Sequence, residues 1–100
     1  MAFILRQRSE PLPRDESRMR EAGNLVARFE AAARARAQDG SRGDGTERAD
    51  SARLRRMSTA CRSELEDARW RLLKGDTLGA DSRLEHAVAV AREGLRSLEA

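Results

Sequence analysis

The fold is decided by the stretch LRRMSTACRSELEDARWRL, residues 54–72. Its apolar side chains recur at steps of three and four residues, which keeps them on one face of an α-helix. They are Leu54, Met57, Cys61, Leu65, Ala68 and Leu72. Two successive steps of four interrupt a strict heptad repeat in this face. The stretch therefore predicts an amphipathic helix, and we expect it to run over about residues 47–74.

Two further segments show the same spacing on either side of this helix. The helix expected over residues 15–38 has the apolar positions Met19, Ala22, Val26, Phe29 and Ala33, and the helix expected over residues 82–99 has Leu84, Val88, Ala91, Leu95 and Leu98. The segments between the helices are short and contain glycine, so neighbouring helices should be antiparallel. The sequence therefore predicts an all-α fold, a small antiparallel three-helix bundle.

Polar residues indicate where the helices begin and how their surfaces are stabilised. Asp15 is the expected N-cap of the first helix. Ser82 and Glu85 have the spacing of a capping box, which predicts that the third helix begins there. Glu30 and Arg34 are an acid-before-base pair one turn apart, a spacing that stabilises a helix locally. A second ridge of Gly23, Ala27, Ala31 and Ala35 would let another helix approach closely.

One hundred residues are enough for one domain at most. We expect residues 14–100 to form a single helical domain and residues 1–13 to form an extended N-terminal arm, because Pro11 and Pro13 favour extended backbone. Phe3, Ile4 and Leu5 make the arm apolar. The arm could cap the bundle, cross to a second subunit or dock on a partner. The large apolar side chains barely line three helix faces, which favours a homodimer or a stabilising partner.

The composition offers little for catalysis. Cys61 is the one cysteine and belongs to an apolar face, so it is expected to behave as a small hydrophobic residue. His86 is the one histidine and is turned away from its helix's main face. Glu64, Glu66 and Asp67 are clustered, but Asp67 has Arg71 as an ion-pair partner one turn on, and a solvated face is the expected role of the cluster. We therefore expect no enzyme, no metal and no cofactor. The sequence shows no signal peptide and no membrane span, which predicts a cytoplasmic protein with no membrane partner.

The charged residues leave two kinds of partner to consider. Formal net charge is +3, and Lys74 is the one lysine among 20 basic residues. This bias can reflect genomic composition or selection for phosphate and carboxylate recognition. Arg55, Arg62 and Arg69 recur every seven residues and could bind nucleic acid from one face of the helix over 47–74. A dimeric nucleic-acid-binding protein is therefore the alternative function.

Binding to a larger protein or protein assembly is the leading expectation. Trp70 and Leu73 lie off the main apolar face, and Arg69 and Arg71 flank Trp70, a composition typical of interface hot spots. Trp70 could instead be covered by the third helix or by the arm. The expected activity is steric, as an inhibitor or adaptor. In size and general character alone, the chain is similar to small proteins encoded by phages and mobile elements, including anti-CRISPR inhibitors.

Overall fold

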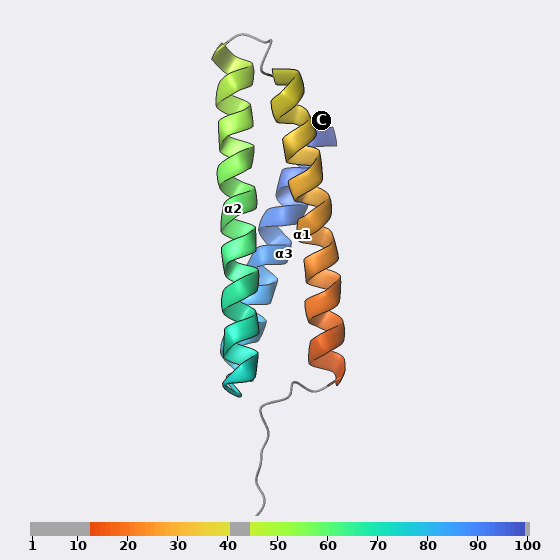
Figure 1. Cartoon of the computed structure of the whole chain (residues 1–100), viewed down its shortest axis with the longest axis vertical. Helices are drawn as coiled ribbons and strands as arrows, with labels where there is room; N and C mark the ends of the chain where they lie inside the picture. Colours follow the sequence, from red (N-terminus) through yellow and green to blue (C-terminus); the bar gives the residue numbers. More distant parts are fainter. Residues whose placement is uncertain (1–12, 41–44, 100) are drawn as a thin grey trace, which may run out of the picture.

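A computed structural model describes residues 13–40 and 45–99 of the chain. They form three helices: α1 (Pro13–Gly40), α2 (Gly45–Leu73) and α3 (Thr77–Glu99). Each helix runs antiparallel to the next, and the three pack side by side along their lengths (Figure 1). The predicted all-α three-helix bundle is confirmed. The expected arm, residues 1–13, lies outside the described residues except for Pro13, and the homodimer stays a prediction. No helix in the described ranges has both the length and the apolar character needed to cross a membrane.

The start of α1 differs from the one that the sequence predicted. The helix begins at Pro13, so Asp15 lies inside its first turn and is not the N-cap. Proline suits the first helical position because its φ is already helical and the N–H that it lacks would have no partner there. The expectation that Pro13 is extended was therefore wrong, and Asp15 is buried.

The start of α3 also differs, because a stronger cap lies upstream of the predicted one. The helix begins at Thr77, and the Asp76 Oδ1 accepts a hydrogen bond from the Gly79 N–H at 3.0 Å. This bond is the one that an N-cap carboxylate makes. Ser82 is exposed in the second turn of α3, so the predicted capping box at Ser82 and Glu85 was wrong.

A glycine closes the turn between α2 and α3. Gly75 has φ +84°, and the Asp76 N–H donates to the Arg71 carbonyl at 2.7 Å while the Gly75 N–H donates to the Leu72 carbonyl at 3.0 Å. These two bonds and the left-handed glycine define a Schellman motif. The motif reverses the chain within Lys74, Gly75 and Asp76, so Leu73 and Thr77 lie at the same end of the bundle.

The core lies along the common axis of the three helices and contains many small side chains. The buried apolar residues are Ala22, Val26, Phe29, Ala33, Leu54, Cys61, Leu65, Ala68, Leu72, Ala80, Leu84, Ala87 and Ala91. On α1 and α2 these match the predicted faces, with Met19 and Met57 partly buried beside them.

The buried face of α3 is rotated from the predicted one. Ala87 and Gly94 are buried, whereas Val88 and Leu95 pack at the margin. The reason is size, because a Cβ on Gly94 would lie 2.2 Å from the Phe29 ring. Phe29 therefore fills the space that a side chain at residue 94 would need, and the small residues of α3 face inward.

The small-residue ridge predicted on α1 is not a helix contact in the described structure. Ala27, Ala31 and Ala35 are exposed. A Cβ on Gly23 would meet only Leu65, at 3.9 Å, which is ordinary contact. Close helix approach takes place at α3 instead.

Candidate protein-binding surface

Three large apolar side chains are exposed where α2 meets α3. Trp70 is 63% exposed, Leu73 47% and Leu78 84%, and they are the large hydrophobic residues that the described part of the chain leaves open to solvent. We call Trp70, Leu73 and Leu78 the apolar end. It lies at the lower end of the bundle in Figure 1. All three lie close to the turn between α2 and α3, and large apolar side chains exposed at one end of a bundle are candidates for an interaction site.

The position of Trp70 on α2 explains its exposure. Its neighbour two residues on, Leu72, is buried against the core, so Trp70 is directed to the outside of the helix. The Lys74 ammonium lies 5.5 Å from the centre of the indole ring, within the range of a cation–π contact. The sequence left open that the third helix or the arm covers Trp70. The third helix, α3, does not bury it, and the arm's residues 1–12 lie outside the described residues.

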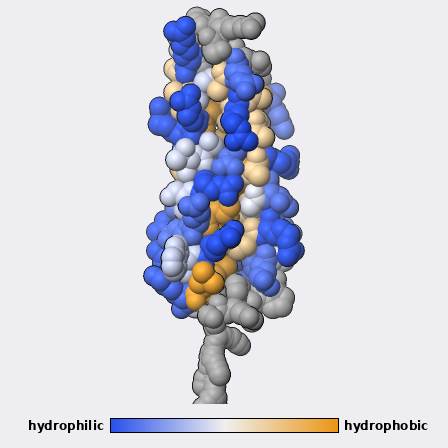
Figure 2. Space-filling model, in the orientation of Figure 1, coloured by the Kyte–Doolittle hydropathy of each residue, from blue (hydrophilic) through white to orange (hydrophobic). Residues whose placement is uncertain are grey.

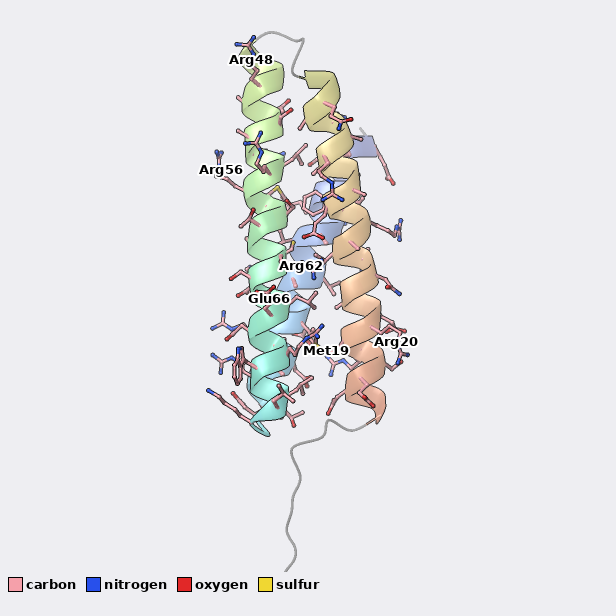
Figure 3. All side chains as sticks on the ribbon, viewed as in Figure 1. Met19, Arg20, Arg48, Arg56, Arg62 and Glu66 are labelled. Atoms are coloured by element: carbon pink, nitrogen blue, oxygen red, sulfur yellow. The ribbon has the colours of Figure 1, made fainter. Side chains whose placement is uncertain are left out.

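A groove between α1 and α2 adjoins the apolar end. Its volume is about 400 Å³, and Leu73 lines it together with Met19 and Leu72. Arg20 of α1 and Arg69 of α2 also line it, as do the polar residues Glu16 and Asn24. Figure 2 shows hydrophobic surface between hydrophilic side chains on this face, toward the lower end. Met19 and Arg20 lie on the lower half of α1 in Figure 3.

The three arginines of the predicted basic face differ in their surroundings. Arg62 lies between α2 and α1 (Figure 3) and donates to both Glu30 carboxylate oxygens, from Nη2 at 2.6 Å and from Nε at 3.1 Å. These hydrogen bonds hold the pKa of Glu30 below its ordinary value. Arg55 and Arg69 are exposed, with no ion pair among the described residues. The row of arginines is therefore interrupted at its centre by a neutral pair.

Arg71 is occupied by contacts within the chain. Its Nε donates to the Asp67 Oδ2 at 2.9 Å, which confirms the expected pair, and its Nη1 donates to the Asp76 Oδ2 at 2.8 Å. Asp76 is also the N-cap of α3, and the Gly79 N–H is the main cause of its lowered pKa. Arg71 therefore stabilises the turn that presents the apolar end.

The remaining candidates for chemistry are held by the packing of α2 on α3. The Arg83 guanidinium pairs with Glu64 at 3.1 Å and with Asp67 at 3.0 Å, and the exposed His86 ring contacts the Glu64 carboxylate through Nδ1. No group of three or more potential metal ligands lies close together within residues 13–40 and 45–99.

Cys61 is a core residue, as the sequence predicted. It is fully buried, and its thiol donates to the Ala87 carbonyl at 3.5 Å. Burial, with smaller contributions from Glu30 and Glu64, raises the pKa of the thiol to about 11. The thiol is therefore protonated at neutral pH, whereas a nucleophilic cysteine needs the thiolate.

No protein-family model, curated protein or solved structure matches this chain.

Sequence reasoning found part of this surface and missed the rest. Trp70 and Leu73 were expected at an interface, and the sequence also places Leu78 just after them, in the turn expected after α2. The groove could not have been found, since Met19 and Arg20 line one groove with Arg69 only because of the register of α1 against α2. That register depends on packing, which helical spacing alone does not specify.

Proposed function

We propose that this chain is a non-enzymatic, cytoplasmic binding module that attaches to a larger protein through its apolar end. The observation that carries the proposal is the joint exposure of Trp70, Leu73 and Leu78 beside arginine side chains. Tryptophan and arginine are the residues most enriched among interface hot spots. A large apolar residue that stays exposed in a chain with so thin a core has not been used for folding, and binding gives it a role.

The mechanism that this surface supports is steric. The Schellman turn and the Asp76 cap give the apolar end a fixed backbone, and Arg71 ties the turn to α2. A preformed surface loses little conformational freedom on binding. A partner held there would have a helical bundle placed over its own surface, so the module would act as an inhibitor or adaptor by occlusion.

Two observations favour binding over catalysis. The one thiol is buried and protonated, and the one imidazole is in contact with a carboxylate that Arg83 also holds. Neither has the nucleophile and base arrangement that covalent catalysis needs.

Nucleic-acid binding is the alternative, and the interrupted arginine row counts against it. Phosphate binding depends on several cations that act together on one polyanion. Arg55 and Arg69 are available, but Arg62 between them is neutralised by Glu30. A dimer could bring two such rows together, so the test must include nucleic acid.

The test is quantitative capture from the native host with the full chain as bait. Wild type is compared with Trp70→Ala and with Arg56→Ala, a control that points away from α1 on the same helix (Figure 3). We expect one protein or complex to bind wild type and the control. Its affinity, measured by calorimetry on the purified partner, should fall about 30-fold with Trp70→Ala, the equivalent of a ~2 kcal/mol hot spot. Far-UV circular dichroism should show unchanged helicity.

Three results would contradict the proposal. Trp70→Ala could unfold the bundle, which would make Trp70 a folding residue. Captured proteins could bind all three baits equally. Nucleic acid could be recovered instead, with binding that falls steeply with salt and depends on Arg55 and Arg69, which would favour the alternative function.

A further inference from the structure

The groove between α1 and α2 suggests which kind of partner the apolar end receives. We propose that the groove binds an acidic amphipathic segment of a partner protein. The apolar side chains of this segment enter the groove, and its carboxylates meet Arg20 and Arg69. This inference rests on the proposed function and adds the chemistry of the partner. Helices that dock in grooves use apolar anchors on one face, and their remaining side chains contact the rim.

The floor of the groove is apolar and continuous with the apolar end. Met19, Leu72 and Leu73 line it, and Leu73 belongs to both surfaces. Gly23 also lines the groove and contributes no side chain to it, and a Cβ there would make only an ordinary contact with Leu65, at 3.9 Å. About 400 Å³ is room for two or three apolar side chains of a partner, within the range of ordinary binding pockets.

The rim of the groove has cations without partners in the described structure. Arg20 and Arg69 are exposed, and neither makes an ion pair with any described residue. Glu16 is the one acidic residue lining the groove. A carboxylate on the partner could accept two hydrogen bonds from a single guanidinium, the strongest pairing open to arginine. The charge of the rim therefore selects an acidic segment over a basic one.

The same charges disfavour the two other occupants. Residues 1–12 contain Arg6 and Arg8 against Glu10, so that segment is basic and would bring cations to cations. A second copy of this chain has a net charge of +3. Like charges across an interface oppose association.

The experiment is a phage-display selection of random 12-residue peptides on the immobilised full-length protein. Selected peptides are synthesised, and their affinities are measured by fluorescence polarisation. We expect enrichment in Asp and Glu together with at least two large apolar residues. Arg20→Glu combined with Arg69→Glu should weaken binding at least tenfold. Gly23→Leu, which fills the groove without changing charge, should do the same.

The matched control is Arg55→Glu combined with Arg56→Glu, an equal change of charge at exposed residues that do not line the groove. It should change affinity less than threefold. Circular dichroism and thermal melts check that each variant is folded, and either groove variant alone is sufficient for the test. Trp70→Ala separates the two proposals, because Trp70 does not line the groove.

Several outcomes would overturn the inference. Peptides could be selected without acidic residues, bind the groove variants as tightly as wild type, or bind no better than about 100 μM. If Trp70→Ala alone abolished binding, the apolar end would remain the site and the groove would be excluded. Phe3→Ser combined with Leu5→Ser could raise peptide affinity tenfold, assigning the groove to the chain's own first residues. Light scattering could show a dimer that the arginine reversals dissociate, assigning it to a second copy.

Discussion

Replacing Gly94 with alanine tests how closely α3 packs against α1. A Cβ on Gly94 would lie 2.2 Å from the Phe29 Cε1 and 2.3 Å from the Cζ. Carbon atoms in contact are about 3.5–4.0 Å apart, so the ring and the helix would have to separate by about 1.3 Å or more. Phe29 is fully buried and cannot turn its ring into solvent. The added methyl group therefore has to displace a helix.

The expected loss of stability follows from two opposing effects. Adding a methyl group to a packed core costs about 1–3 kcal/mol, and a required shift of more than ~1 Å places this site near the upper value. Alanine gains about 1 kcal/mol over glycine inside a helix. The free energy of unfolding should therefore fall by about 2 kcal/mol, and Tm by about 8–16 °C for a chain of this size.

Gly23→Ala is the matched control, because it makes the same chemical change in α1. Its Cβ would lie 3.9 Å from the Leu65 Cδ2, an ordinary contact. The helix-propensity gain should then be realised in full, raising stability by about 1 kcal/mol. Urea unfolding followed by circular dichroism measures both variants against wild type.

The close packing of Gly94 would be refuted if Gly94→Ala were as stable as wild type or more stable. A double-mutant cycle with Phe29→Leu gives an independent check, because leucine removes the ring that the methyl group would meet. Phe29→Leu should cost less in the Gly94→Ala background than alone, with a coupling energy of about 1 kcal/mol or more. Additive effects would show that the two residues are not in contact.

Three further predictions concern the turn, the ion pair and the thiol. Gly75→Ala should lower the free energy of unfolding by about 1–2 kcal/mol in a urea titration, because a left-handed residue then acquires a Cβ. The contact with Arg62 that lowers the pKa of Glu30 contributes its full stabilisation above pH 4.5, the ordinary pKa of this carboxyl group, and the contribution is lost as the pH falls through the lowered pKa of the folded chain. In an acid titration, Tm should therefore fall less steeply for Glu30→Gln than for wild type. Cys61 should not react with a thiol reagent at pH 8 in the native chain and should react at once in urea, because burial raises its pKa to about 11; fast native labelling would contradict this.

The existence of the three helices could be predicted from spacing, but their ends could not be predicted as well. Steps of three and four residues identify an amphipathic helix wherever it begins. The start of α3 depended on a choice between Ser82 and Asp76, two residues that can each cap a helix. Gly75 decides it, because its left-handed φ ends α2 and leaves Asp76 as the first available cap.

The faces and the cross-helix contacts depend on information that one helix does not contain. On α3, Ala87 and Val88 are both apolar, and which of them faces inward depends on the bulk of Phe29 opposite Gly94. The local pair of Glu30 with Arg34 was expected, yet Glu30 accepts two hydrogen bonds from Arg62 of α2. A local pair one turn apart contributes only a few tenths of a kcal/mol, so a two-bond contact across helices displaces it readily.

The distribution of these contacts explains why the open surface lies beside α1. The seam between α2 and α3 is held by Arg83 with two carboxylates and by His86 with Glu64. Among the described residues, the ion pair that joins α1 to α2 is Arg62 with Glu30, halfway along the helices. Below that pair, Gly23 of α1 and the exposed Leu73 of α2 line the groove. The groove therefore lies below the ion pair that links α1 to α2, on the side of the bundle away from the charged seam between α2 and α3.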